Sequence, residues 1–304
     1  MKHLLLTALF CAIHVSATLS QPCVEASRPQ PPVLSEKTRA AYEANLAEAR
    51  EEYDKNPKSA DAIIWLGRRS AYLGNYKAAI KIFGDGLALY PGDARFYRHR
   101  GHRFITLRCF DDAIRDFAFA AKLIRGKPDE VEPDGIPNER NTPTSTLQSN
   151  IWYHLGLAYY LKGDFKRAAN AYVEAFKVSK NNDMLAATTH WYYMALRRLE
   201  KNAQAQQILE PIDGDFEVIE NEDYLRLLRL YRGEVKPEMI LAFMEEGAGT
   251  LSNASLGYGI GNWFLYNRDR SRAFDTFRRI VAGNQWASFG YIAAEAELAR
   301  ANSN

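Results

Sequence analysis

One short stretch of the sequence is dense in side chains that can bind ions. Residues 97–108 read YRHRGHRFITLR, with several arginines and two histidines around a single glycine. His99 and His102 are three residues apart, a spacing that can share a metal ion on one helical face. The arginines could instead bind the phosphates of a nucleic acid. A third and fourth metal ligand are not apparent in the sequence, so we expect no metal site.

Signatures of enzymes are missing from the sequence. It has no P-loop, HExxH, GxSxG, CxxC or EF-hand pattern. The glycine-rich GYGIG at 257–261 lies in a helical pattern without a preceding strand, which argues against dinucleotide binding. The net charge of +2 is too small to imply nucleic acid. We therefore expect no catalytic residues, no cofactor and no nucleic-acid partner.

The N-terminus has the layout of a secretory signal peptide. Residues 1–17 contain one lysine, an apolar run of about a dozen residues and small residues at the end. The run is shorter than the roughly 20 residues that span a bilayer, and no second segment of that length follows. We expect export to the periplasm or the medium, with no transmembrane segment in the mature chain; an uncleaved anchor is the less favoured reading.

The proline-rich residues 18–34 predict a flexible tether. Two cysteines remain after cleavage, Cys23 and Cys109, and in an oxidising compartment they could pair. Cys23 could alternatively carry a lipid, although Pro22 is not the small residue that a lipoprotein signal has before its cysteine. The sequence leaves this choice open.

Internal repetition is the main signal in the sequence for the arrangement of its helices. In four segments a glycine precedes an alanine by 12 residues, and an aromatic residue follows the alanine by four. This spacing fits two antiparallel helices whose backbones approach closely at the glycine and the alanine, with the aromatic ring filling the space beside them. The four sets are Gly67, Ala79 and Phe83; Gly101, Ala113 and Phe117; Gly156, Ala168 and Tyr172; and Gly261, Ala273 and Phe277.

The pattern resembles the tetratricopeptide repeat family, whose 34-residue unit is a helix–turn–helix. Pro91 and Trp152 match further positions of that family's pattern. Residues 183–254 fit two degenerate units, each with two short helices, and the helical segments at 35–57 and 286–300 suit the two ends of an array. We predict an all-α chain in which residues 35–300 form one α–α superhelix, a right-handed solenoid of about six repeats with capping helices at both ends.

A proline-rich, acidic insertion at 126–148 interrupts the array. Residues 145–148, STLQ, resemble a capping box that restarts the helix. Arg100 stands where other repeats have an apolar residue in the seam between helices, and burying it unpaired is costly. Its candidate partners are Asp112 and Asp116 of the next helix and Glu130, Glu132 and Asp134 of the insertion; exposure of Arg100 to solvent is the alternative. We expect the insertion to fold back on the basic helix 95–107.

The resemblance implies that the first helices line a concave groove that binds an extended peptide or a helix of another protein. The residues expected to face this groove are Arg68, Arg98, His102, Tyr153, Tyr160, Tyr258 and Asn262. They would make it basic at one end and aromatic along the middle. The leading interpretation is an exported scaffold for protein–protein interaction. The alternative is an enzyme or small-ligand-binding protein with its site between the insertion 126–148 and the helix 95–107.

Overall fold

The computed structural model describes residues 23–246 and 251–302, and this part of the chain is all-α. The predicted signal peptide, residues 1–17, lies outside the described residues. The helices are α1 (Cys23–Ala26), α2 (Glu36–Lys55), α3 (Ala60–Tyr72), α4 (Tyr76–Leu89), α5 (Ala94–Thr106), α6 (Phe110–Leu123), α7 (Leu147–Leu161), α8 (Phe165–Val178), α9 (Asn182–Arg198), α10 (Asn202–Gln207), α11 (Glu222–Tyr231), α12 (Pro237–Glu246), α13 (Leu251–Tyr266), α14 (Arg270–Val281) and α15 (Phe289–Asn302).

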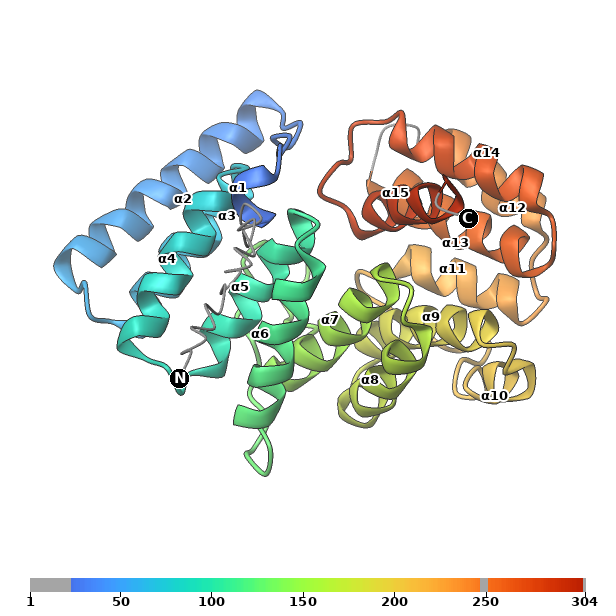
Figure 1. Ribbon diagram of the computed structural model, residues 1–304, viewed down its shortest axis with the longest axis horizontal. Helices are drawn as coiled ribbons and strands as arrows, with labels where there is room; N and C mark the ends of the chain where they lie inside the picture. Colours follow the sequence, from blue (N-terminus) through green and yellow to red (C-terminus); the bar gives the residue numbers. More distant parts are fainter. Residues whose placement is uncertain (1–22, 247–250, 303–304) are drawn as a thin grey trace, which may run out of the picture.

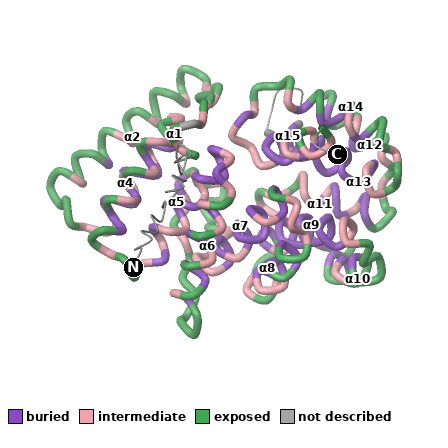
Figure 2. The backbone as a smooth tube through the Cα atoms, in the orientation of Figure 1, coloured by how far each residue is buried: buried purple, intermediate pink, exposed green. Residues whose placement is uncertain are grey.

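The helices from α3 to α14 pack as six consecutive antiparallel pairs, each against the next (Figure 1). The predicted number of repeats is confirmed within the described residues. Helix α2 covers one end of the array and exposes most of its surface (Figure 2). Helix α15 follows the last pair and packs on both α13 and α14. The superhelix predicted from the repeats is therefore the architecture of the described chain.

The glycine positions of the repeats are sites of close contact between the two helices of a pair. A Cβ atom added to Gly101 would lie 2.8 Å from the ring of Phe117, and one on Gly156 would lie 2.7 Å from the ring of Tyr172. The same relationship joins Gly67 to Phe83 and Gly261 to Phe277. The alanines of all four sets are fully buried. The seam inferred from the spacing is thus present in four repeats.

The local sequence explains where the helices begin and end. The side chains of Ser35, Ser59 and Asp269 accept hydrogen bonds from backbone N–H groups of the first turns of α2, α3 and α14. Gly74 and Gly163, in the turns within the first and third pairs, have positive φ. The degenerate region 183–254 also forms two helix pairs, α9–α10 and α11–α12, as predicted.

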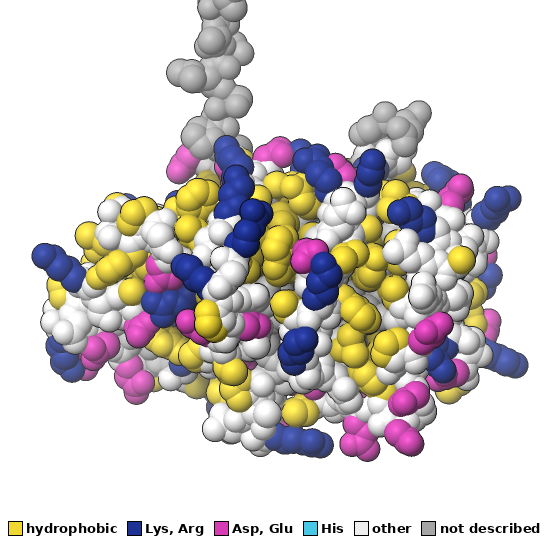
Figure 3. All heavy atoms as spheres, turned by 90° about the horizontal axis from the view of Figure 1, so that it is seen from below, with side chains coloured by type: hydrophobic (Ala, Val, Ile, Leu, Met, Phe, Trp, Pro, Cys, Tyr) yellow, Lys and Arg dark blue, Asp and Glu magenta, His cyan; other side chains and the backbone are white. Residues whose placement is uncertain are grey.

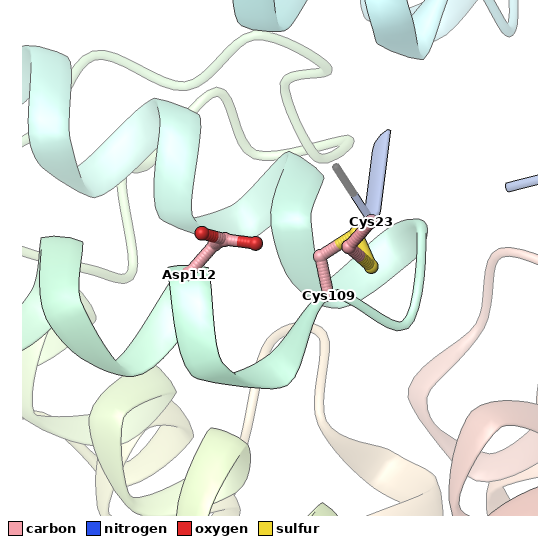
Figure 4. A group of neighbouring side chains, drawn as sticks. All are labelled: Cys23, Cys109 and Asp112. Carbon is pink, nitrogen blue, oxygen red and sulfur yellow. A yellow bond between two sulfur atoms is a disulfide. The ribbon is translucent and has the colours of Figure 1, made fainter. Parts of the chain in front are cut away.

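The N-terminal segment is anchored rather than free. A disulfide joins Cys23, in α1, to Cys109, in the turn between α5 and α6 (Figure 4). Lys77 of α4 donates a hydrogen bond to the carbonyl of Glu25, and Pro31 and Pro32 lie against Gly74. The prediction of a flexible tether is wrong for these residues, while residues 18–22 lie outside the described part. Of the alternatives for Cys23, the structure shows the disulfide with Cys109.

The C-terminal helices fold back on the earlier repeats. Tyr258 of α13 donates a hydrogen bond of 2.9 Å to the hydroxyl of Tyr160 on α7, and its ring stacks on Trp191 of α9. Helix α15 contacts the second pair, because its Glu295 forms a 2.7 Å ion pair with Arg108 of the α5–α6 turn. The array therefore curls until its last helices contact its second and third pairs.

The surface gives two further observations. None of the helices in the described ranges combines the length and apolarity that crossing a membrane requires. On the face shown in Figure 3, basic and acidic side chains are interspersed among hydrophobic ones. This distribution agrees with the small net charge of +2.

Candidate functional site on the inner face

The inner face of the superhelix is the surface formed by the first helices of the pairs, α3, α5, α7, α9, α11 and α13. Successive first helices contact one another, and α13 also reaches α9. The basic stretch of the sequence is α5, which therefore lies between α3 and α7 in this layer. Its glycine, Gly101, serves the contact with Phe117 described above.

Arg100 is paired within its own repeat. Its guanidinium donates two hydrogen bonds to Asp116 on α6, with Nε–Oδ2 and Nη2–Oδ1 distances of 2.8 and 2.7 Å. Such a bidentate arrangement is the strongest geometry for an arginine and a carboxylate. Of the five candidate partners, Asp116 is the one that pairs with Arg100, so the insertion does not supply the partner.

The insertion nevertheless folds back on α5, through a different arginine. Glu132 forms an ion pair with Arg98, 2.9 Å from Oε2 to Nε, and the side chains are only 10% and 11% exposed. The amide of Asn150 on α7 donates a further hydrogen bond of 3.2 Å to the same carboxylate. The predicted docking of the acidic insertion on the basic helix is confirmed, with Arg98 in place of Arg100.

The insertion crosses the inner face from the first repeat to the fifth. At one end Arg68 and Arg69 of α3 donate hydrogen bonds of 2.9 and 2.7 Å to the carbonyls of Pro133 and Gly135. At the other end Glu220, just before α11, accepts hydrogen bonds from Asn138 and Thr144 at 2.6 and 2.9 Å. We call residues 126–146 the strap, because they connect distant parts of the superhelix.

The N-cap of α7 lies one residue later than the predicted capping box indicated. An antiparallel bridge joins Val131 to Thr146, and Thr146 is the N-cap of α7. The capping box is formed by Thr146 and Ser149, rather than by the Ser145 and Gln148 of the predicted motif. The hydroxyl of Ser149, at the third helical position, accepts the return hydrogen bond of 2.9 Å from the backbone N–H of Thr146. Glutamate or glutamine usually accepts this bond, which is why the motif was placed one residue early.

A pocket of about 160 Å³ lies beneath the strap, between α3 and α5. We call it the arginine pocket, because the guanidinium groups of Arg68, Arg98 and Arg103 line it, together with Tyr72, His99, His102, Glu132 and Asp134. Burial, with the nearby arginines as a smaller cause, holds the pKa values of His99 and His102 well below the usual range. Both imidazoles are therefore neutral at pH 7, and the charges of the pocket belong to the arginines and the two acids.

His102 is part of an aromatic cluster rather than a metal site. Its ring lies 4.8 Å from that of His154 and 5.3 Å from that of Phe289, measured between ring centres. His154 is buried, its Nδ1 lies 2.6 Å from the carbonyl oxygen of Asn150, and burial lowers its pKa to about 3. These imidazoles pack as neutral rings at the centre of the inner face.

Five of the seven residues predicted to line the groove are buried. Arg68 lines the arginine pocket, but for the other four the predicted groove position is wrong. Tyr160, Tyr258 and Asn262 join in one hydrogen-bonded cluster, in which the amide of Asn262 donates to the Tyr160 hydroxyl at 2.9 Å. Tyr153 is also buried, and each of the four side chains is at most 5% exposed. Tyr160, Tyr258 and Asn262 are covered because α13 packs against α7 and α9, whereas Tyr153 lies against the rings of His154 and Tyr172. Arg68, Arg98 and His102, by contrast, meet at the arginine pocket as one group.

An acid that the sequence did not single out supports this buried cluster. Glu297 of α15 is 3% exposed and contacts Arg198 and Arg300 at 2.5 and 2.7 Å. Burial alone would raise the pKa of Glu297, but the two arginines outweigh it and the pKa is lowered. The periodic alanines and acids of α15 predict a helix, yet nothing in them shows which earlier repeat it will contact.

A second, larger space remains open at the centre of the inner face. This central pocket has a volume of about 400 Å³. Its walls come from α5, from the start of α11, from α13 and from the segment before α15, and they comprise His102, Glu220, Asn221, Asp223, Tyr224, Ser255, Ala287, Ser288 and Phe289. Of this set only His102 was predicted to face the groove. The others lie in or beside the degenerate repeats, or at the start of the predicted capping helix 286–300, where no repeat pattern indicates which side chains face inward.

One group of potential metal ligands occurs away from the inner face. Cys23, Cys109 and Asp112 bring ligand atoms within 4.8 Å of one another (Figure 4). Both sulfur atoms are used in the disulfide, so neither is a thiolate, the form of cysteine that binds metals. The group is therefore a disulfide with a neighbouring carboxylate.

Comparison with known protein families identifies one of the helix pairs. Residues 149–182, which comprise most of α7 and all of α8, match the tetratricopeptide repeat family. No curated protein matches the chain. Among solved structures, MamA aligns at 14% identity and a TM-score of 0.42, covering 57% of this chain and 88% of that chain. YrrB, described as a TPR protein with an unusual peptide-binding site, aligns at 13% identity and a TM-score of 0.43, covering 84% and 98%.

The family match lies in the third helix pair, where Gly156 packs on Tyr172 in the same way as in three other pairs. The six consecutive pairs extend this unit along the described chain. The described part of the chain is therefore an all-α superhelix of helix pairs, one of which, at residues 149–182, matches the tetratricopeptide repeat family.

Proposed function

We propose that this protein is an exported scaffold that binds a segment of another protein at the central pocket. The observation that carries the proposal is the pocket itself, which lies on the inner face of a repeat superhelix and measures about 400 Å³. That volume is within the range of pockets that bind ligands. Repeat superhelices of this kind generally serve as scaffolds without catalytic activity, and the proposal assigns no reaction to the pocket.

The walls of the pocket suit a side chain that is partly apolar and partly polar. Tyr224 and Phe289 offer aromatic surface, and aromatic residues supply much of the affinity of protein interfaces. Glu220 is held in place by its two hydrogen bonds from the strap, so it needs little ordering when a partner binds. A partner that inserts an anchoring side chain as part of an extended peptide or a helix fits these features.

Blocking the pocket without disturbing the packing tests the proposal. Ser255 lines the pocket from α13, and Ser255→Arg would fill the space with a long side chain. The matched control is Ser271→Arg, the same change at an exposed position of α14. The partner should be recovered by affinity purification from the native cell envelope with the wild type and the control, and lost with Ser255→Arg. Equal recovery with both variants and unchanged circular dichroism would contradict the proposal.

Export is a separate part of the proposal. It rests on the signal-peptide layout of residues 1–17 and is supported by the disulfide, because such bonds persist mainly in oxidising compartments. Fractionation of the native host should place the protein outside the cytoplasm, with an N-terminus that begins after residue 17. Recovery of an uncleaved chain in the cytoplasmic fraction would refute this part and leave the central pocket to be judged on its own test.

A further inference from the structure

The arginine pocket holds more positive charge than its acids neutralise by direct contact. Arg98 is paired with Glu132. Arg68 and Arg103 also line the pocket, and in the described part of the chain neither has a carboxylate oxygen within the 4.0 Å of an ion pair. The second acid, Asp134, accepts a hydrogen bond from the backbone N–H of Ile136 and pairs with none of the three arginines. Two guanidinium groups therefore face the pocket without an ionic partner.

The burial of Arg68 and Arg103 makes an unpaired positive charge on either side chain energetically costly. Arg68 is only 8% exposed, and its contacts are the carbonyl of Pro133, the hydroxyl of Tyr72 and the ring of Trp65. Arg103 is partly buried, and its guanidinium carbon lies 6.0 Å from the centre of the Tyr76 ring. Taking an ion out of water without a counter-charge costs several kcal/mol. Burial lowers the pKa of Arg103 to about 10, which agrees with a charge that lacks compensation.

The remaining lining adds polarity without charge. His99 and His102 are neutral, since their pKa values lie well below the usual range, and Nδ1 of His99 is 3.2 Å from Nη1 of Arg98. The hydroxyl of Tyr72 lies beside Arg68 at 3.4 Å from Nε. A ligand here would meet three guanidinium groups, a phenol, two imidazoles and the carboxylates of Glu132 and Asp134, so that cationic groups outnumber anionic ones. Such a set is suited to an anion.

The size of the pocket limits what the anion can be. A volume of about 160 Å³ is roughly that of five water molecules in the liquid, and it is below the range of pockets for larger organic ligands. The planar fork of a guanidinium matches the paired oxygens of phosphate, sulfate or carboxylate groups. From this geometry we propose that the arginine pocket binds a small free oxyanion of the phosphate or sulfate type, held by Arg68, Arg98 and Arg103.

This inference goes beyond the proposed function and is independent of it. The arginine pocket lies under the strap between α3 and α5, whereas the central pocket lies toward α11 and α13, and His102 is the one residue that lines both. A bound anion would also strengthen the attachment of the strap, since Arg68 and Arg98 hold Pro133 and Glu132 of the strap as well. Loss of partner binding after Ser255→Arg therefore says nothing about the anion.

Isothermal titration calorimetry of the mature chain with inorganic phosphate, and then with sulfate, at constant ionic strength tests the proposal. We expect one site with a dissociation constant below about 1 mM for at least one of these anions. Arg103→Gln removes a guanidinium that has no ion pair and should weaken binding at least about tenfold, because a hydrogen bond to a charged group is being lost. The matched control, Arg279→Gln, makes the same change at an exposed position of α14 and should bind like the wild type.

Two further measurements keep the result interpretable. Thermal unfolding in anion-free buffer should show that Arg103→Gln is at least as stable as the wild type, since it removes an uncompensated charge. Adding phosphate should raise the melting temperature of the wild type and the control, but not that of Arg103→Gln. Glu132→Gln, which removes the acid facing the anion, should bind it more tightly. Absence of binding by both anions, or equal affinities of the wild type and Arg103→Gln, would overturn the proposal.

Discussion

Arg100 of α5 and Asp116 of α6 form a bidentate ion pair in the seam of the second repeat, at 2.7 and 2.8 Å. The carboxylate side chain is 7% exposed and the guanidinium 24%. Other repeats have Leu66, Leu155 and Ile260 at the position of Arg100. The second repeat thus uses a salt bridge where the others use apolar contact.

Removing one partner of this pair should destabilise the protein. Asp116→Asn leaves Arg100 without its counter-charge, and we expect the free energy of unfolding to fall by about 2–4 kcal/mol, because breaking a largely buried pair is costly. The control is Asp111→Asn on the same helix, whose exposed pair with Lys162 should matter by less than about 1 kcal/mol. Urea denaturation of both variants measures the difference; equal losses would show that the pair adds nothing specific.

Adding even one methyl group at a glycine of the glycine–aromatic contacts should lower the stability of the protein. Gly156→Ala places a methyl group 2.7 Å from the Tyr172 ring, and overpacking of this kind costs about 1–3 kcal/mol, partly offset by the better helix propensity of alanine. Gly92→Ala is the control, since nothing lies within 4 Å of its added Cβ. Chemical denaturation should show a loss for Gly156→Ala alone. If Tyr172→Leu in the same chain fails to reduce that loss, the ring is not its cause.

Stability should decrease as the pH falls below about 6.5. Burial lowers the pKa values of His154 and His190 to about 3, so between pH 6.5 and 3 the unfolded chain binds protons that the folded chain does not. Each histidine then lowers the free energy of unfolding by up to about 1.4 kcal/mol for each pH unit of acidification. His154→Gln should reduce the slope of unfolding free energy against pH by about one proton between pH 5 and 6. An unchanged slope would mean that His154 is already charged when folded.

Reduction of the disulfide should weaken the N-terminal half of the superhelix. Cys23 and Cys109 are 86 residues apart, and a cross-link closing a loop of that length stabilises a protein by about 2–5 kcal/mol. We expect a lower melting temperature of the mature chain in reducing buffer. Cys23→Ser should melt at the same temperature with and without reductant. Free thiols in the oxidised mature chain, detected by alkylation, would contradict the pairing.

The parts of this structure that sequence predicts are those whose partners are close in the chain. Gly101 and Phe117 are 16 residues apart in one repeat, and the spacing recurs four times, so the contact is encoded locally. Arg100 also finds its partner inside the repeat, at Asp116, although the acids of the insertion were equally plausible from charge alone. The docking of the insertion on α5 was correctly expected, but the face of α5 was not. Arg98 rather than Arg100 pairs with Glu132, and which arginine does so depends on side-chain directions.

The errors concern contacts between distant repeats. Tyr160 and Tyr258 occupy positions that face the inner side, and in an open array they would line a groove. Here they touch each other across 98 residues, because the rotation from one repeat to the next brings α13 against α7. That rotation accumulates from small packing differences in every seam, so it cannot be predicted from the periodic pattern of residues.

The strap should make this array harder to extend than a solenoid whose repeats contact only their neighbours. In a simple solenoid each repeat touches only its neighbours, so the molecule can stretch like a spring and unravel from either end. The hydrogen bonds from Asn138 and Thr144 to Glu220, together with the pair between Arg108 and Glu295, tie turns that are far apart in the chain. Because distant repeats are joined, the superhelix should resist extension. Its repeats should unfold together in a single transition rather than one after another.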